Sequence, residues 1–388
     1  MPPNDGWGTP VNSERPRRCA VVLQTPRDPH SAVYMSYRAL GSALEARGHS
    51  LEILCPTDFA SIRRWHGRWV PLAYPFAVAS WLRQHRADVD VVMFHSYAGW
   101  LATARSRGSR PRTVVMFHGI EPLYHRELAH EAREDGRPLS WRYRLLQERL
   151  MPWMLRRACR AADAVTCLNK AEATFLIDRN WASPAQVRVV AHSVPEEFFA
   201  PLRANRPLRS MLFVGQWLPM KGIRYLRDAA VTLLQGDPSM RLVCAGTLVA
   251  EPGVLADFPT ELHRRVVVKP RVEPAALAGL YREADVFVFP SLYEAFSRAV
   301  AEAMASRLPI VTTAVGVAAD ALRNEESALI VPRRSAGAIV TAVRRLKGEA
   351  GFAARLADAA AAAAERYRRE LTEPATLAAI LGADGGTL

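Results

Sequence analysis

The sequence predicts an α/β protein with two doubly wound, Rossmann-like domains, whose parallel sheets face a central cleft. Short apolar runs alternate with segments of helical periodicity along the whole chain, which is typical of βαβ units. A polar, proline-containing link at residues 201–209 interrupts this alternation, which then begins again. The chain has 388 residues. That length suffices for two domains with full cores, and their ligand is expected in the cleft.

Each strand is predicted from a continuous run of β-branched and other apolar residues, as expected for strands that are buried on both faces. In the first half these runs are residues 19–23, 51–55, 89–94, 113–117, 164–168 and 187–190. In the second half they are residues 211–214, 242–245, 266–268, 286–289, 310–312 and 328–331. Ala-rich helices are predicted at residues 352–369 and 374–381, where the chain closes.

These patterns divide the chain into four parts, at residues 1–18, 19–200, 201–370 and 371–388. The first part is rich in Pro, Gly, Asn and Ser and has no apolar h-region. It is therefore predicted to be a disordered tail and not a signal peptide. The second and third parts are the two domains, and the last is a C-terminal helix and tail.

The composition restricts the partners and the compartment. The net charge is +13 and the pI is about 10.0, which favours polyanions such as nucleotide phosphates, anionic lipid or nucleic acid. Nucleic acid is the weakest of these, because no helix-turn-helix, zinc-finger or RNP pattern is present and the arginines are scattered. The five cysteines stand singly, mostly in apolar runs. They indicate reduced core thiols in a cytoplasmic protein, and no metal site is expected.

The segment from Arg63 to Arg83 interleaves cations with Trp, Tyr and Phe around a short apolar stretch. It is shorter than the ~20 residues of a membrane-spanning helix. One interpretation is a peripheral contact with an anionic membrane surface. The alternative is a buried connection between a helix and a strand, with an Arg-rich rim.

The segment from Asp285 to Ala305 is the most informative part of the chain. A predicted strand closed by Pro290 leads through a short loop into an Ala-rich helix, for which Ser297 is the expected N-cap. Glu294 lies in the loop and Glu302 in the helix. On a continuous helix their carboxylates would be roughly 12 Å apart, about the distance from a ribose to a hexose across a diphosphate.

Two glutamates on a helix are ordinarily solvated or paired with Lys or Arg. Here their position at the carboxyl end of a strand favours ligand binding, and the helix N-terminus suits a pyrophosphate. No Gly-x-Gly-x-x-Gly, Walker or Gly-x-Ser-x-Gly pattern is present at the required places. Nicotinamide or flavin dehydrogenases, P-loop phosphotransferases and serine hydrolases are therefore disfavoured.

Several motifs in chain order resemble glycosyltransferase family 4, over roughly residues 21 to 331. They are residues 40–49 (LGSALEARGH), 117–119 (FHG), 213–222 (FVGQWLPMKG), 290–305 (PSLYEAFSRAVAEAMA) and 309–316 (PIVTTAVG). The resemblance implies the GT-B fold, in which residues 19–200 form the acceptor-side domain and residues 201–370 the nucleotide-sugar donor domain. It also implies a retaining, metal-independent hexosyltransferase that has the nucleotide sugar as substrate and needs no cofactor.

The same resemblance implies three catalytic residues. Lys221 would neutralise the leaving diphosphate, Glu294 would hold hydroxyls of the transferred sugar, and His118 would bond the sugar near its anomeric centre. The alternatives are an exposed loop lysine, a surface glutamate and a histidine of the core or of a strand end.

The remaining donor-binding residues are predicted on the same grounds. Phe296 and Ser297 would offer backbone N–H groups to the diphosphate, and Glu302 would bind ribose hydroxyls. Gly215 and Gln216 belong to the loop that precedes Lys221. Gln216 stands where the family commonly has arginine, so one cation is replaced. Other departures are Pro29-His30-Ser31 in place of a glycine pair and Ala191-His192-Ser193 in place of Asn-Gly.

The predicted function is transfer of a sugar to a glycan, a lipid-linked sugar or a small-molecule hydroxyl, in polysaccharide, glycolipid or glycoconjugate biosynthesis. The expected location is the cytoplasm, with peripheral contact to the inner face of the cell membrane. One alternative is a nucleotide-sugar epimerase of the same fold, which would turn over the donor without an acceptor. Another is a non-catalytic sugar-nucleotide or polyanion-binding protein, which would bind the donor without turnover.

Overall fold

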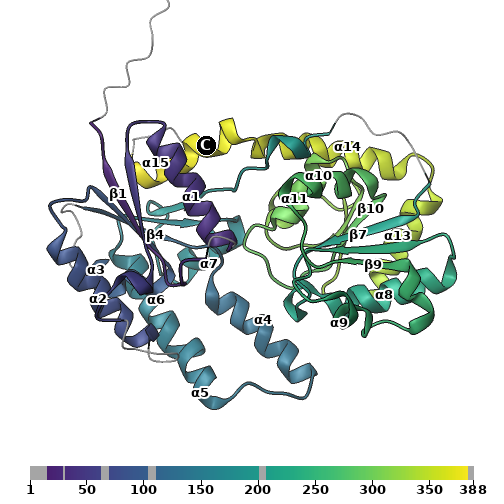
Figure 1. The fold of residues 1–388 in the computed structure, drawn as a ribbon, viewed down its shortest axis with the longest axis horizontal. Coiled ribbons are helices and arrows are strands. Elements are labelled where there is room, and N and C mark those ends of the chain that lie inside the picture. The colour runs from purple at the N-terminus through teal and green to yellow at the C-terminus, as the bar shows by residue number, and fades with distance from the viewer. Residues whose placement is uncertain (1–14, 29–30, 63–69, 104–110, 201–206, 383–388) are drawn as a thin grey trace, which may run out of the picture.

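The computed structural model describes residues 15–28, 31–62, 70–103, 111–200 and 207–382. In this part of the chain, twelve strands form two parallel six-stranded sheets, which lie side by side (Figure 1). The predicted α/β class with two doubly wound sheets is confirmed. Each predicted strand has an observed counterpart that agrees within about two residues at either end.

The first sheet has the strand order β2-β1-β3-β4-β5-β6. Its strands are β1 (Arg18–Val22), β2 (Ser50–Leu54), β3 (Val91–His95), β4 (Arg112–Met116), β5 (Ala164–Cys167) and β6 (Val187–Val189). The order reverses between β1 and β3, so the loops that leave these strands diverge. Ligands of open α/β sheets bind at such a switch point.

The second sheet has the strand order β12-β11-β10-β7-β8-β9. Its strands are β7 (Ser210–Val214), β8 (Arg241–Ala245), β9 (Val266–Lys269), β10 (Val286–Phe289), β11 (Ile310–Thr313) and β12 (Leu329–Val331). Here the switch point lies between β7 and β10. The loops that follow these two strands contain most of the residues predicted to bind the donor.

Helices cover both faces of each sheet. The N-terminal lobe consists of the first sheet with α1 (Ala32–Glu45), α2 (Val70–Gln84), α3 (Trp100–Thr103), α4 (Glu121–Glu134), α5 (Trp141–Arg144), α6 (Met151–Ala161), α7 (Lys170–Asp178) and α15 (Arg369–Leu381). The C-terminal lobe consists of the second sheet with α8 (Ile223–Gly236), α9 (Glu251–Leu255), α10 (Pro274–Glu283), α11 (Arg298–Ala305), α12 (Val317–Ala321), α13 (Ala336–Gly348) and α14 (Phe352–Ala364).

Strand β1 shows why the strands are apolar throughout. Cys19 and Val21 pack into one cluster with α1 and α15, whereas Ala20 and Val22 pack into another with α2. Successive side chains of a strand point to opposite faces, so burial on both faces requires an unbroken apolar run. The five cysteines are all buried and free, as predicted.

The C-terminal helices differ from the prediction at two ends. Helix α14 ends at Ala364 and a 3₁₀ turn follows, after which α15 begins at Arg369 and includes Pro374. The predicted end of the first helix at residue 369 and the predicted start of the second at Pro374 were therefore wrong. Helix α14 lies on the C-terminal lobe, whereas α15 returns to cover the first sheet (Figure 1).

Three other predictions fall partly outside the described residues. Residues 1–14 of the predicted tail, residues 201–206 of the link and residues 63–69 of the Arg/aromatic segment are not described. The rest of the Arg/aromatic segment is helix α2, which buries Tyr74 and Val78 and leaves Phe76 63% exposed. In the described ranges, no helix combines the length and the apolar character that crossing a bilayer requires.

Candidate active site

Two loops of the C-terminal lobe meet where β7 and β10 lie side by side. The carbonyl oxygen of Met220 accepts hydrogen bonds from the N–H of Leu292 at 2.9 Å and the hydroxyl of Ser291 at 3.0 Å. Gly222 has φ 71°, and a Cβ there would lie 2.0 Å from the carbonyl oxygen of Pro290. Only glycine permits this approach, so the two loops form one surface at the switch point.

Lys221 and Glu294 form an ion pair on this surface. The Nζ of Lys221 lies 2.6 Å from Oε1 of Glu294, and the hydroxyl of Ser291 donates to the same oxygen at 2.7 Å. The Lys221 ammonium also lies 5.6 Å from the ring centroid of Phe289. An ammonium carries three donors, so Lys221 can bond Glu294 and also a phosphate oxygen.

Gly215 and Gln216 precede Lys221 on the same loop. The N–H of Gly215 donates to the carbonyl of Ala245 at 2.9 Å, which anchors the start of the loop to β8. Gln216 is exposed. The chain therefore presents a neutral, solvated side chain at the position where the resemblance leads one to expect a cation.

The start of helix α11 is shaped by a loop that folds against it. Gly316, with φ 52°, would place a Cβ 2.6 Å from the carbonyl oxygen of Phe296, and the N–H of Val317 donates to that oxygen at 2.6 Å. Ser297 is the N-cap residue of α11, as predicted, but it has the left-handed φ of 69° and its side chain makes no cap bond. Its buried Oγ has no hydrogen-bond partner among the described residues.

Glu302 lies within α11 and is buried, with 7% exposure. Its Oε2 accepts a hydrogen bond from the hydroxyl of Tyr281 at 2.9 Å. Burial raises the pKa of the Glu302 carboxyl, while the nearby charge of Arg298 and the Tyr281 bond oppose this rise. The carboxyl is thus held in one orientation, as a group that recognises hydroxyls requires.

His118 lies just after β4 in a cluster of aromatic rings. Its ring centroid is 5.1 Å from Tyr37, 5.3 Å from His95 and 5.5 Å from His192. His192 in turn lies 5.4 Å from Phe296, so the rings connect the two lobes. Burial lowers the pKa of His118 to about 4 and the pKa values of His95 and His192 to about 3. All three imidazoles are therefore neutral at pH 7.

A second polar cluster lies at the carboxyl end of the first sheet. The side chain of Glu121, at the start of α4, accepts hydrogen bonds from Gln24 at 3.2 Å and from the hydroxyl of Ser96. Ser96 has φ 57°, a strained conformation for a residue other than glycine. Burial raises the pKa of Glu121, although the hydrogen bonds from Ser96 and Gln24 oppose this effect. Oε2 of Glu121 is buried without a hydrogen-bond partner in the described part of the chain.

The two lobes also meet through the loop that carries Glu294. The hydroxyl of Tyr293 accepts from the N–H of Ile120 at 2.7 Å and donates to Glu172 at 2.6 Å. Nδ2 of Asn169 donates to the carbonyl of Ala295 at 2.6 Å. Residue 120 comes two positions after His118, so these bonds fix the loops of His118 and Glu294 relative to each other.

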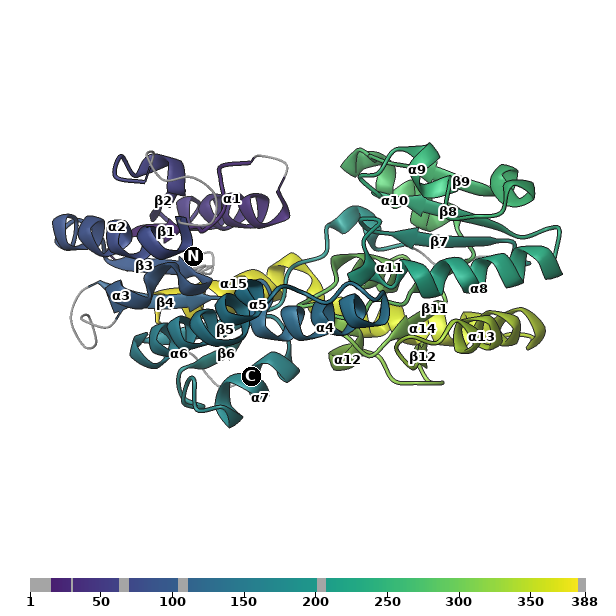
Figure 2. The ribbon, with the colours of Figure 1, turned by 90° about the horizontal axis from the view of Figure 1, so that it is seen from below.

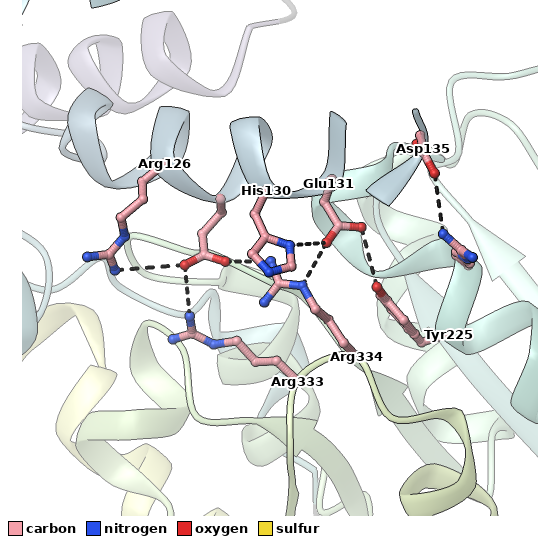
Figure 3. A network of polar contacts seen from close by, with 9 residues as sticks. Arg126, His130, Glu131, Asp135, Tyr225, Arg333 and Arg334 are labelled. Carbon is pink, nitrogen blue, oxygen red and sulfur yellow. Dashed lines mark hydrogen bonds and ion pairs between the residues drawn. The ribbon is translucent and has the colours of Figure 1, made fainter. Parts of the chain in front are cut away.

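Helix α4 reaches across to the C-terminal lobe and forms an interlobe clasp with Arg334 (Figure 3). Arg334 donates to Oε2 of Glu127 at 2.7 Å and to Oε1 of Glu131 at 2.8 Å. Arg333 and Tyr225 reach the same two carboxylates at 3.3 and 3.5 Å. Both glutamates are buried, at 8% and 5% exposure. The clasp therefore holds the lobes together beside the site.

The structure thus joins Lys221 to Glu294 directly and His118 to Phe296 through His192. Sequence reasoning missed Glu121, His192 and Tyr293 as members of the site. Glu121 comes two residues after the motif at 117–119 and Tyr293 lies within the motif at 290–305, so a polar residue at a strand end was the available signal. His192 had been noted only as a departure from the family pattern.

Comparison with protein families gives two matches that together span most of the chain. Residues 35–198 match the model described as Glycosyltransferase Family 4, and residues 209–349 match the one described as Glycosyl transferases group 1. A D-inositol 3-phosphate glycosyltransferase of Streptomyces bingchenggensis is 26% identical over 77% of this chain and 68% of its own length. That of Thermomonospora curvata is 31% identical over 57% of this chain and 56% of its own. The chain thus spans little more than half of the length of several such relatives.

Solved structures with the same fold cover nearly the whole chain. Sucrose-phosphate synthase from Thermosynechococcus elongatus has a TM-score of 0.73 at 18% identity, over 93% of this chain and 97% of that one. WaaG, a glycosyltransferase involved in lipopolysaccharide biosynthesis, has a TM-score of 0.70 at 16% identity, over 95% and 100%. Anabaena Alr3699/HepE, solved in complex with UDP-glucose, has a TM-score of 0.64 at 15% identity, over 93% and 98%.

Proposed function

Since this chain belongs to glycosyltransferase family 4 and has the GT-B fold, we propose that it transfers a sugar from a nucleotide-sugar donor to an acceptor hydroxyl. The observation that carries the proposal is the Lys221–Glu294 pair at the switch point of the second sheet. A cation and a hydroxyl-binding carboxylate stand together there, as a sugar diphosphate requires.

We assign the donor contacts to residues of the two loops and of helix α11. Lys221 and the backbone N–H groups at the start of α11 neutralise the diphosphate as it leaves. Glu294 accepts hydrogen bonds from the transferred sugar, and Glu302 from the ribose. Solved relatives of the fold bind UDP and UDP-glucose, which makes a uridine diphosphate sugar the first donor to test.

We assign the acceptor side of the site to residues of the N-terminal lobe. His118, held neutral by burial, can donate or accept a hydrogen bond near the anomeric carbon without adding a positive charge. The unpartnered Oε2 of Glu121 supports a role in receiving an acceptor hydroxyl. Retention of configuration, which the family membership implies, requires the acceptor to attack from the face that the diphosphate leaves.

The acceptor class is a glycan, a lipid-linked sugar or a small-molecule hydroxyl. Relatives named D-inositol 3-phosphate glycosyltransferase make that compound a suitable first probe. We propose that the enzyme works in the cytoplasm. We also propose that the segment from Arg63 to Arg83 contacts the inner face of the membrane, although Arg64, Arg68 and Trp69 lie outside the described residues. The exposed Phe76 of α2 supports this contact.

The test begins with thermal unfolding of the full chain in the presence of nucleotide diphosphates and their sugars. A ligand that binds only the folded state raises the unfolding free energy by about 2.7 kcal/mol at a hundred times its Kd. The donor so identified is then incubated with and without acceptors. Release of nucleotide diphosphate that depends on the acceptor supports transfer.

Three other outcomes would contradict the proposal. Isomerisation of the donor sugar without an acceptor would indicate an epimerase. Tight donor binding with no turnover by any acceptor class would indicate a binding protein. If no nucleotide diphosphate or nucleotide sugar stabilises the folded protein, the proposed donor site does not bind such ligands.

A further inference from the structure

Residues 141–161 form one uninterrupted helical run on the N-terminal lobe, which we call the α5–α6 rod. It joins α5 and α6 through a π-helical turn at Leu145–Leu150. The inner side of the rod packs against the first sheet, because Met151, Met154 and Leu155 are buried in the cluster that contains residues of β4 and β5. The outer side of the rod faces away from the core.

The outer side carries large apolar side chains in the open. Trp141 is 69% exposed, Leu145 is 56% exposed and Trp153 is 47% exposed. A scattered apolar residue on a surface needs no explanation, but three on one rod do. Tryptophan is enriched where one end of a side chain meets apolar material and the other meets water, as at the boundary of a bilayer.

The same side is strongly basic. The rod contains six arginines and one acidic residue, Glu148, which pairs with Arg144. All six are exposed, and two lie over the exposed tryptophans: Arg142 is 5.4 Å from the ring centroid of Trp141, and Arg157 is 5.5 Å from that of Trp153. The remaining arginines of the rod are Arg149, Arg156 and Arg160. The apolar and cationic groups are thus interleaved along one surface.

The rod does not stand alone on its side of the lobe. Helix α3 packs against both α2 and α6, and the ring of Trp100 on α3 lies 5.0 Å from that of Trp153. Figure 2 shows α2, α3, α6 and α5 together on the side of the first sheet that faces the viewer. Helix α2 contributes Leu72 and Phe76, which are 38% and 63% exposed. Several elements therefore build one broad face.

From this arrangement we propose that the α5–α6 rod is a docking surface for an anionic lipid bilayer. The tryptophans and Leu145 enter the boundary between headgroups and acyl chains, while the arginines bond lipid phosphates. The rod itself lies outside Arg63–Arg83, whose residues Leu72 and Phe76 lie on the neighbouring helix α2. Vesicle binding by the rod can be measured without any sugar transfer, so this proposal does not depend on the proposed transfer activity.

Charge favours a bilayer over a protein partner of the same kind. A second copy of this chain would bring the same arginines against the rod in a symmetric contact, and like charges would repel. The whole protein has a net charge of +13, which opposes self-association further. A surface rich in phosphate has the complementary charge.

The experiment is sedimentation of the full chain with phosphatidylcholine vesicles, with and without phosphatidylglycerol. We expect the wild type to sediment only with the anionic vesicles. Raising the salt from about 0.1 M to about 1 M should release it, because the Debye length falls from roughly 10 Å to roughly 3 Å. Equal sedimentation with and without anionic lipid would overturn the proposal.

Two variants test the two chemistries of the surface. The first is Trp141→Ser with Leu145→Ser, and the second is Arg142→Gln with Arg149→Gln and Arg156→Gln. We expect each to lower the partition coefficient by about tenfold or more, since each arginine near an anionic surface contributes severalfold and apolar insertion adds to it. Unchanged thermal unfolding and donor affinity would show that the fold is intact.

Matched variants elsewhere on the surface serve as controls. Leu371→Ser on α15 removes a leucine that is 58% exposed, against 56% for Leu145. Arg38→Gln with Arg264→Gln and Arg344→Gln removes the same charge from exposed positions outside the rod. Vesicle binding should survive in both. Equal losses in the rod and control variants would overturn the proposal, as would a dimer in sedimentation velocity that Leu145→Ser abolishes without any vesicle binding.

Discussion

The Nζ of Lys221 lies 2.6 Å from Oε1 of Glu294, and the pair joins two loops that leave neighbouring strands. Each side chain therefore holds the other in position in the protein without a ligand. The close approach at Gly222 and Pro290 sets the distance between the loops, and so it also sets the distance between these two charges. The pair thus places the cation expected to face the phosphates directly beside the carboxylate expected to face the sugar.

We expect Lys221→Ala to lower turnover by on the order of a hundredfold or more, as for other lost electrostatic stabilisers of a transition state. The cause is loss of the cation that compensates the leaving diphosphate. Steady-state kinetics measure the effect, with Lys347→Ala as the control, because Lys347 pairs with Asp237 away from the site. Near-normal turnover in Lys221→Ala would show that Lys221 does not compensate the charge of the leaving diphosphate.

The two motif glutamates should separate nucleotide recognition from sugar recognition. Glu302→Gln should weaken both the free nucleotide diphosphate and the sugar nucleotide, whereas Glu294→Gln should weaken only the sugar nucleotide. A loss of roughly 1.5–3 kcal/mol is expected for hydrogen bonds to a charged group. The amide of Glu302→Gln still offers an oxygen to Tyr281, so thermal unfolding should hold. Calorimetric titration of both variants with both ligands measures these losses. Equal losses of affinity for the bare nucleotide diphosphate in the two variants would contradict the assignment.

Glu121 should act on the acceptor and not on the donor. We expect Glu121→Gln to raise the KM for the acceptor by about tenfold, as for one lost charged hydrogen bond, and to leave the donor Kd unchanged. Steady-state kinetics at varied acceptor concentration give the KM for the acceptor, and calorimetric titration with the donor gives the donor Kd. The glutamine retains partners for Gln24 and Ser96. A parallel loss of donor affinity would mean that Glu121 supports the donor site instead.

The buried histidines should make stability depend on pH. The folded-state pKa values are about 3 for His95 and His192 and about 4 for His118, all below the ordinary 6.5. Between pH 6.5 and 4 the unfolded chain therefore binds protons that the folded chain does not. The free energy of unfolding should fall as the pH falls through this window, with a slope of up to about 1.4 kcal/mol per pH unit for each histidine.

Other groups titrate in the opposite sense, so a variant is needed to isolate this effect. Burial raises the pKa values of Glu121, Glu172 and Glu302, and their protonation favours the folded state as the pH falls. Urea unfolding of the wild type and of His95→Asn from pH 7 to 4 gives the histidine contribution as a difference. The stability of the wild type relative to the variant should decline on acidification. A difference that is independent of pH would contradict the prediction.

The interlobe clasp should control the separation of the lobes. Arg334→Gln leaves the buried carboxylates of Glu127 and Glu131 without their shared guanidinium, at a cost of about 1.5–3 kcal/mol. We expect a larger radius of gyration in X-ray scattering and weaker donor binding. Each lobe has its own sheet and apolar cluster, so both should stay folded.

Two further variants separate the effect of losing the clasp from the effect of the left-handed backbone at Arg334. Arg334 has φ 64°, so Arg334→Gly relieves the backbone and removes the guanidinium in one step. It should open the lobes as Arg334→Gln does. Adding Glu127→Gln and Glu131→Gln to Arg334→Gln removes the uncompensated charges and should restore compactness in part. Scattering identical to the wild type in all three variants would exclude the clasp as a determinant.

The strands and the donor loops were predictable because their signals are local. A strand such as Val286–Phe289 is buried on both faces and so is apolar throughout, and its end marks where a ligand can bind. Ser297 shows the limit of such reasoning. Its residue type favours an N-cap and it occupies that position, yet its backbone is left-handed and its hydroxyl makes no cap bond.

The contacts between the lobes were not predictable, because no local signal selects their partners. Glu131 and Arg334 are 203 positions apart, and Arg334 is one of many arginines scattered through the chain. The same holds for His192 and Phe296, whose ring contact depends on how the lobes meet. In α15 the helix begins five residues before Pro374, so the preference of proline for the first turn gave the wrong start.

Helix α15 makes the first lobe depend on a segment that is synthesised after the whole second lobe. Leu377, Ile380 and Leu381 cover a face of the first sheet, and Arg112 donates to the carbonyl of Ile380 at 3.0 Å, across 268 positions. During translation, helix α1 can cover part of this face early, but the part under α15 stays uncovered until the whole second lobe has been made. Closing contacts over such separations is slow. The first lobe therefore completes its core only after the second lobe has been made, although the two sheets are distinct in space.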